Sequence, residues 1–266
     1  MKRIDWTIGT CGADAVGYLH EHFEEMANRQ VRPCVVVCPG GGYQYCSRRE
    51  NEPVAAALFA AGFHVFVLTY SVGEQAANLQ PLSELAALVA QIRRQHEALN
   101  IDPEKIAVMG FSAGGHLAGS LGTLWHHAPL LQRIGATAEE CRPDAMILCY
   151  PVLMAGKLAH RGSIQNVTGG DAALLELLSL ENQVRADTPP AFLWHTATDG
   201  SVPVENTLVF ASALQENGVP FEAHVFATGG HGLSLCNEEV NTPHPANSLW
   251  FPLLLNWLEG TFDFRR

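Results

Sequence analysis

Short runs of apolar residues recur along the chain, separated by stretches in which apolar positions return with helical spacing. The runs are apolar at every position rather than at alternate ones, which is typical of strands buried on both faces of a parallel sheet. The pattern predicts a further strand at residues 221–226, ahead of a glycine-flanked loop. The clearest runs predict strands at residues 34–38, 65–68, 106–109, 146–149 and 191–194.

The stretches between these runs predict helices. Glycine follows two of them, so Gly218 and Gly260 are expected to end the fourth and the fifth helix. Strand and helix alternate along the chain, which predicts an α/β fold with helices on both faces of a sheet. No repeat or low-complexity linker divides the sequence, so one domain over residues 1–266 is expected. The predicted helices span residues 53–61, 82–99, 113–124, 204–217 and 248–258.

Residues 151–190 interrupt the alternation. They hold a leucine-rich helical pattern near residues 174–180 and end in Thr-Pro-Pro. One interpretation is an insertion that covers the open end of the sheet as a partial lid. The other is an irregular crossover that only packs against the sheet.

Composition narrows the classes of partner and compartment. The formal net charge of -11 opposes binding to nucleic acid and favours neutral substrates. No apolar run is long enough to span a membrane, and no apolar stretch follows the two early basic residues as in a secretory signal. The seven cysteines are scattered and form no CxxC pair, which indicates a reducing cytoplasm. The sequence leaves open whether the protein forms a homo-oligomer.

A serine stands between two glycines directly after the apolar run at residues 106–109. The sequence Gly110-Phe111-Ser112-Ala113-Gly114 matches G-x-S-x-G and leads into a helical pattern of small residues. A nucleophile at such a strand-to-helix turn occupies a strained backbone, and glycines remove side chains that would clash there. The context therefore predicts that Ser112 is an activated nucleophile.

A serine nucleophile needs a base that takes its proton and an acid that orients the base. In proteins with this strand–turn–helix motif, the acid and the histidine follow the serine on loops after later strands. Asp199 follows the run at residues 191–194, and His231 follows the predicted strand at residues 221–226. The order Ser112, Asp199, His231 predicts a catalytic triad.

Other titratable residues are alternatives to this set. His116 lies on the helix after the serine and His195 closes a strand, so both are expected to be packing residues. His126 and His127 are adjacent and point apart, which disfavours a metal site, and no metal is expected. Asp171 is the rival acid, but its loop precedes the strand that delivers the acid in this architecture.

Residues 39–43 read PGGGY and directly follow the first apolar run. The stretch resembles the HGGG-type loop that supplies backbone N–H donors to an oxyanion, with proline in place of histidine. Tyr43 and Tyr45 come at the end of the loop and are expected to bind substrate by narrowing the pocket. The expected oxyanion donors are the amides of Gly41, Gly42 and Ala113.

Together these motifs resemble the α/β-hydrolase superfamily, and within it the acetylxylan-esterase-like carbohydrate esterases. The resemblance implies an α/β-hydrolase fold with a mostly parallel, eight-stranded sheet. It also implies cofactor-free hydrolysis of a small-molecule ester with a short acyl group, such as an acetyl ester of a neutral sugar. It covers about residues 32–257 and is carried by PGGGY, SRREN (47–51), LTYSV (68–72), GFSAGGHLA (110–118), TPPAFLWHTATDGSVPVENT (188–207) and GGHGLSL (229–235).

Two other functions stay open at this point. Such sequences also resemble the hydrolase domains of prolyl-peptidase-like enzymes, although no room for an accessory propeller is expected and no Glu-Glu pair stands out to hold a substrate amine. A non-catalytic binding protein of this fold is expected to have a damaged triad or oxyanion loop, and both motifs are intact in the sequence.

The two candidate acids can be separated by substitution. Asp199→Asn is expected to lower kcat by roughly two to four orders of magnitude, because the base loses the group that fixes its tautomer. Asp171→Asn is expected to leave kcat near the wild-type value. Measuring kcat of both variants on one acetyl ester makes the comparison, and the reverse ranking would show that the acid is misassigned.

Overall fold

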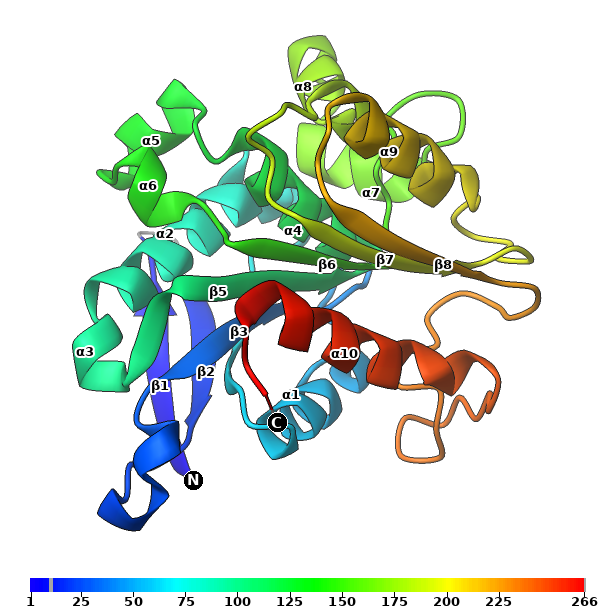
Figure 1. Cartoon of the computed structure of the whole chain (residues 1–266). Coiled ribbons are helices and arrows are strands. Elements are labelled where there is room, and N and C mark those ends of the chain that lie inside the picture. Colours follow the sequence, from blue (N-terminus) through cyan, green and yellow to red (C-terminus); the bar gives the residue numbers. More distant parts are fainter. Residues whose placement is uncertain (10–11, 266) are drawn as a thin grey trace.

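The six predicted strands form one continuous parallel array in the computed structural model, which describes residues 1–9 and 12–265. With two further strands they make an eight-stranded sheet in the order β1-β2-β4-β3-β5-β6-β7-β8 (Figure 1). The prediction of a mostly parallel sheet is confirmed. Thr10, Cys11 and Arg266 lie outside the described residues. The parallel strands are β3 (Arg32–Cys38), β4 (His64–Thr69), β5 (Ile101–Phe111), β6 (Ala145–Cys149), β7 (Ala191–Thr196) and β8 (Phe221–Phe226).

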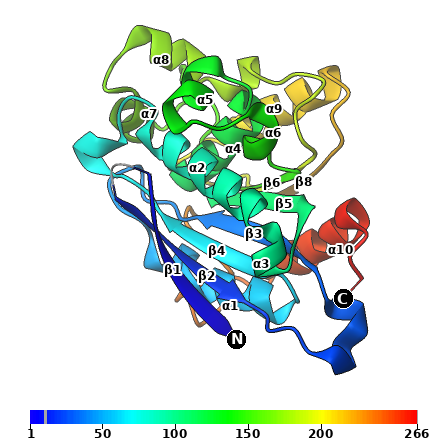
Figure 2. The same cartoon turned by 90° about the vertical axis from the view of Figure 1, so that its left-hand side faces the viewer.

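Two strands were absent from the prediction, β1 (Lys2–Ile8) and β2 (Ala13–Leu19). They pair antiparallel with each other, and β2 pairs antiparallel with β4. Figure 2 shows them along one side of the sheet, where burial alternates from residue to residue. Strands with one exposed face lack the continuous apolar run that identifies the central strands.

Each central strand contributes side chains to two apolar cores, one on each face of the sheet. In β3, Cys34 and Val36 pack into the core that contains side chains of α2 (Gln80–Arg94), α4 (Ala113–Leu124) and α9 (Glu205–Glu216). Val35 and Val37 pack into the opposite core with α1 (Glu52–Ala60) and α10 (Trp250–Phe262). Helices therefore cover both faces, as predicted (Figure 1).

Two helix boundaries differ from the sequence prediction. The helix expected at residues 82–99 is divided at Gln95 into α2 and the short α3 (His96–Leu99). The last helix continues through Gly260 and ends at Asp263, which takes a positive φ of 44°. The prediction that Gly260 ends this helix is therefore wrong, whereas Gly218 follows the C-cap of α9 as expected.

Short helices fill the long connections. α5 (Ala128–Ile134) and α6 (Ala138–Cys141) lie between α4 and β6. The span 151–190 contains α7 (Arg161–Thr168), α8 (Ala172–Leu177) and a 3-10 turn at Leu180–Asn182. Asp171 caps α8, since its Oδ1 accepts from the amides of Ala173 and Leu174 at 2.7 and 3.2 Å. Within the described residues, no helix has both the length and the apolar character needed to cross a membrane.

Helix α9 offers a direct test of the two-sided packing. Phe210 is fully buried in the core beneath α9, whereas Leu208 on the same helix is 51% exposed. Phe210→Ala is expected to lower the free energy of unfolding by about 3–5 kcal/mol, because it removes apolar contacts and leaves a cavity. Leu208→Ala should change it by less than about 0.5 kcal/mol. Urea denaturation of both variants gives the comparison, and equal losses would contradict this packing.

Candidate active site

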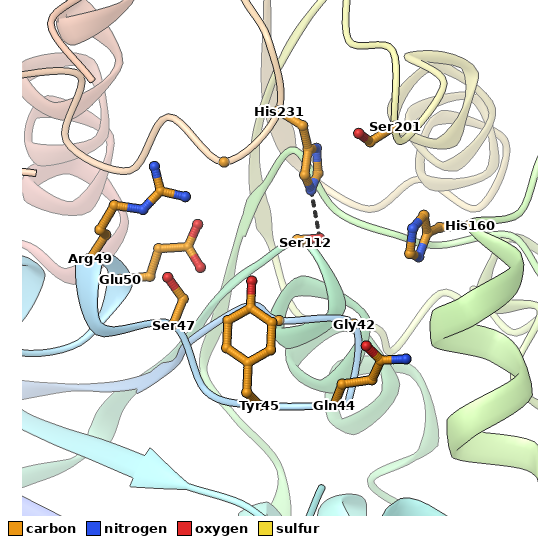
Figure 3. Close-up of a pocket in the computed structure, with 12 residues that line it drawn as sticks. Gly42, Gln44, Tyr45, Ser47, Arg49, Glu50, Ser112, His160, Ser201 and His231 are labelled. Atoms are coloured by element: carbon orange, nitrogen blue, oxygen red, sulfur yellow. Dashed lines mark hydrogen bonds between the residues drawn. The ribbon is translucent and has the colours of Figure 1, made fainter. Parts of the chain in front are cut away.

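The carboxyl ends of the parallel strands deliver the predicted site residues to one edge of the sheet. Ser112 follows β5, Asp199 follows β7 and His231 follows β8. A pocket of about 330 Å³ opens at this edge. Its lining comprises Gly41, Gly42, Gln44, Tyr45, Ser47, Arg49, Glu50, Ser112, His160, Ser201, His231 and Gly232 (Figure 3).

Ser112 occupies a tight turn between β5 and α4. Its φ of 54° and ψ of -116° are rare for a residue with a side chain. A Cβ on Gly110 would lie 1.9 Å from the carbonyl oxygen of Gly114, and a Cβ on Gly114 would lie 2.1 Å from that of Cys38. Both glycines of G-x-S-x-G are therefore required by close backbone contacts.

A chain of hydrogen bonds joins the three residues that the sequence singled out. The Nε2 atom of His231 lies 2.7 Å from the Oγ atom of Ser112, and its Nδ1 atom lies 2.6 Å from Oδ2 of Asp199. A carboxylate accepts hydrogen bonds, so Nδ1 carries the proton and Nε2 is left to accept from the serine hydroxyl. This is the relative placement of nucleophile, base and orienting acid.

The side chain of Asp199 is buried and well supplied with donors. Its Oδ1 accepts from the amides of Ser201 and Val202 at 2.9 and 3.0 Å, and Nε2 of His195 lies 3.3 Å from Oδ2. Burial opposes ionisation, but hydrogen bonds from His195 and His231 outweigh it and hold the pKa of Asp199 well below its usual range. The acid therefore stays ionised at neutral pH.

The glycine loop after β3 lines the same pocket as Ser112. Gly41 and Gly42 have φ values of 131° and 65°, and neither amide donates a hydrogen bond within residues 1–9 and 12–265. Ala113 is the first residue of α4, where an amide has no partner within the helix. Gly41, Gly42 and Ser112 therefore line one pocket, and Ala113 directly follows Ser112.

Three contacts hold this loop in place. The amide of Asn166, on α7, donates to the carbonyl of Gly42 at 2.9 Å. The Tyr70 hydroxyl donates to the carbonyl of Pro39 at 2.5 Å, and the Gly73 amide donates to that of Tyr43 at 2.7 Å. The segment 151–190 therefore supports the loop through α7.

The two tyrosines after the glycines take different directions. Tyr45 is 60% exposed and lines the pocket, and its role in binding substrate stays a prediction. Tyr43 is only 1% exposed, and its hydroxyl lies 2.9 Å from Nδ1 of His116 in the core. Tyr43 has a positive φ of 58° and is not among the residues that line the pocket. The prediction that Tyr43 binds substrate is corrected accordingly.

Three of the alternative histidines, His116, His195 and His126, have protein partners for their side chains. His116 is fully buried between Tyr43 and the carbonyl of Leu178, which lies 3.0 Å from Nε2, and burial lowers its pKa to about 4. His195 accepts from Thr207 at Nδ1 and donates from Nε2 to the carbonyl of Val202. His195 packs as predicted and also contacts Asp199. His126 lies 2.6 Å from the guanidinium of Arg185.

The sequence analysis did not assign several of the residues that line the pocket to the site. Arg49 and Glu50 lie on one side of the Ser112–His231 pair, and His160 and Ser201 lie on the other (Figure 3). Arg49 and Glu50 belong to the SRREN motif, which carried part of the family resemblance but had no assigned role. His160 comes from the segment 151–190, where no motif marks it.

A family profile described as BD-FAE matches residues 22–214 of the chain. The matched residues cover more than half of the chain and include the glycine loop, Ser112 and Asp199. They end before His231, so the histidine is located by the structure rather than by the match.

The chain is similar to an acetylxylan esterase of Xylanibacter ruminicola, with 30% identity over 206 residues. That alignment covers 74% of this chain and 40% of the esterase. The chain spans less than half the length of the first curated relatives that it matches.

Two solved structures have the same fold. The acetyl ester-xyloside bifunctional hydrolase of Caldicellulosiruptor lactoaceticus is 39% identical with a TM-score of 0.80, covering 95% of this chain and 89% of that chain. MGS-M1, an α/β hydrolase from a deep-sea metagenome library of the Medee basin, is 33% identical with a TM-score of 0.82, covering 99% of both chains. The expected α/β-hydrolase fold is confirmed.

The turn at Ser112 predicts an unequal response to two glycine substitutions. Gly114→Ala is expected to destabilise the fold by more than about 4 kcal/mol, because the new Cβ meets backbone atoms that cannot move away. Gly260→Ala is the control. It lies within α10 with no atom near its Cβ and should gain about 0.5–1 kcal/mol. Thermal melting of both variants tests this, and a Gly114→Ala variant as stable as wild type would contradict it.

Proposed function

The chain belongs to the BD-FAE family, and we propose that it is a serine carboxylesterase that removes acetyl and other short acyl groups. The observation that carries the proposal is the unbroken hydrogen-bond chain from Ser112 through His231 to Asp199, in which Ser112 and His231 line an open pocket. The names of relatives, an acetylxylan esterase and an acetyl ester-xyloside hydrolase, support an acetyl ester as the substrate.

In the proposed reaction the Oγ atom of Ser112 attacks the ester carbonyl carbon while Nε2 of His231 takes the hydroxyl proton. Asp199 stabilises the imidazolium that forms, through its bond to Nδ1. His231 then gives the proton to the leaving alcohol oxygen, and an acyl-enzyme remains on Ser112. Water activated by the same histidine attacks the acyl carbonyl and releases the acid.

The developing oxyanion needs donors that are aimed before the reaction begins. The free amides of Gly41 and Gly42 and the helix-terminal amide of Ala113 are proposed for this role. Because Asn166 and the Tyr70 hydroxyl already hold the loop, these donors need little reorganisation when the substrate arrives.

The pocket lining supports an alcohol rich in hydroxyl groups. Polar side chains surround Ser112 on both sides, and Tyr45 offers an exposed ring on which a sugar can pack. We therefore propose neutral sugars or oligosaccharides as the alcohol half of the ester. The polar side chains are Gln44, Ser47, Arg49, His160 and Ser201.

A peptidase that holds a substrate amine needs a free carboxylate in the pocket. Glu50 is the one acidic residue among the described residues that line it, and both of its oxygens already accept hydrogen bonds. This arrangement favours the esterase over the prolyl-peptidase-like alternative. A non-catalytic role is disfavoured by the complete set of hydrogen bonds at Ser112.

The remaining sequence predictions enter the proposal unchanged. We propose one domain over residues 1–266, with 151–190 as a partial lid, supported by the contacts of His160 and Asn166 with the site. A cytoplasmic location and a homo-oligomer stay predictions. The six described cysteines are free, in line with a reducing compartment.

A substrate panel tests the proposed function. The wild-type protein is expected to hydrolyse p-nitrophenyl acetate and acetylated xylo-oligosaccharides. It is expected to hydrolyse p-nitrophenyl octanoate slowly and aminoacyl anilides not at all. Ser112→Ala should remain folded while kcat falls by about a millionfold. A variant that keeps more than a tenth of wild-type activity would remove the assignment of Ser112. A preference for anilides would instead favour the peptidase.

A further inference from the structure

Glu50 is a buried carboxylate beside the site that the proposed reaction does not use. It ends the 3-10 turn at Arg48–Glu50 and is only 3% exposed. Its Oε2 accepts from the amide of Gly40, in the oxyanion loop, at 2.8 Å. Its Oε1 accepts from the hydroxyl of Tyr150, directly after β6, at 2.6 Å.

Tyr150 extends this contact to the histidine loop. Its Oη accepts from the amide of Ser234 at 2.8 Å, three residues beyond His231. Its ring meets the His231 ring edge-on, with centroids 5.2 Å apart and an interplanar angle of 73°. The Ser234 hydroxyl donates to the carbonyl of Arg49 at 2.6 Å, which closes the network. Glu50 thus ties the oxyanion loop to the loop that carries the base.

The hydrogen bonds identify the charged form of Glu50. Both of its oxygens face donors, and the Tyr150 oxygen already receives the Ser234 N–H, so the tyrosine hydrogen points to Glu50. Burial raises the pKa of Glu50 above its usual value, and hydrogen bonds from Tyr150 and Gly40 and the proximity of His231 limit that rise. A carboxylate is the form that these contacts satisfy.

We infer that Glu50 is a positioning residue for the proposed esterase reaction: it fixes the oxyanion loop and, through Tyr150, His231, and its charge stabilises the imidazolium. The inference rests on the proposed function. Asp199 orients His231 at Nδ1, and Glu50 supplies a second negative charge near the ring.

Other charged or titratable groups also face His231. Asp199 contacts it directly and is itself contacted by His195. His160 and Arg49 line the same pocket from opposite sides (Figure 3). The substitutions below leave all four in place, so a change in pH dependence reports on Glu50.

The test compares Glu50→Gln, Glu50→Asp and a matched control, Glu84→Gln, with wild type. Glu84 is an equally buried carboxylate on α2, bonded to Ser71 and Gln80 and absent from the pocket lining. For each variant we measure kcat, KM and the pH dependence of kcat/KM on p-nitrophenyl acetate, and the melting temperature. The Ser112→Ala variant is measured in the same assay to give the background rate.

Glu50→Gln keeps the shape but removes the charge. It is expected to lower kcat roughly ten- to a hundredfold with KM little changed, because the oxyanion loop and the base lose their alignment. The acid limb of the pH profile should move to lower pH by roughly half to one unit, since the imidazolium loses a nearby negative charge. Glu84→Gln should lower the melting temperature without moving the acid limb.

Glu50→Asp distinguishes the effect of the negative charge from the effect of side-chain length. It keeps the negative charge but is too short to hold both Gly40 and Tyr150, so kcat should fall while the acid limb stays within a few tenths of a unit of wild type. If Glu50→Gln fails to fold, Glu50→Asp still tests the inference. A wild-type kcat for Glu50→Asp would then overturn it.

An unshifted acid limb in Glu50→Gln, or a shift that Glu84→Gln reproduces, would reduce Glu50 to a structural role and overturn the inference alone. Activity retained in Ser112→Ala would overturn the proposed function, and the inference with it. The two failures are therefore distinguishable in one set of assays.

Discussion

The backbone turn at Ser112 is the constraint on which the rest of the site depends. A residue with a side chain at a φ of 54° and a ψ of -116° costs on the order of 1–3 kcal/mol, so the surroundings must hold it. The amide of Ser112 donates to Cys149 at the end of β6, and its carbonyl accepts from His116 and Val152. These contacts require β5, β6 and α4 to pack closely, and that packing excludes any side chain at Gly110 and Gly114.

The same turn decides where the other groups must lie. It places Oγ of Ser112 2.7 Å from Nε2 of His231, and the amide of Ala113 at the start of α4. A base can reach that oxygen only from a loop beyond the carboxyl ends of the neighbouring strands. β7 and β8 supply such loops, and β3 supplies the glycine loop from the other side. Strand order therefore explains why residues from four strand ends meet.

Two buried carboxylates lie near His231 and are held in different ways. Asp199 accepts from His231 and two amides and is also contacted by His195, and Glu50 accepts from one amide and one tyrosine. Each has enough donors to remain ionised despite burial, which an unpaired buried charge could not. The negative charge at the site is therefore held by hydrogen bonds, and the pocket lining combines polar side chains, Arg49 and the hydrogen-bonded Glu50.

The sequence by itself determined the parallel core and the identity of the three hydrogen-bonded residues. Continuous apolar runs, glycine spacing and the order of serine, acid and histidine are patterns along the chain. They can be recognised in the sequence because burial and local sterics restrict which residues are allowed there. Tertiary structure alone decided that Tyr43 turns inward to His116, and that Glu50 meets Tyr150 from 100 positions away. It also decided that His195 reaches Asp199 and that α10 passes Gly260. These outcomes depend on which distant segments pack together. The direction of a side chain among such neighbours produces no periodic pattern in the sequence, so it cannot be predicted from the sequence alone.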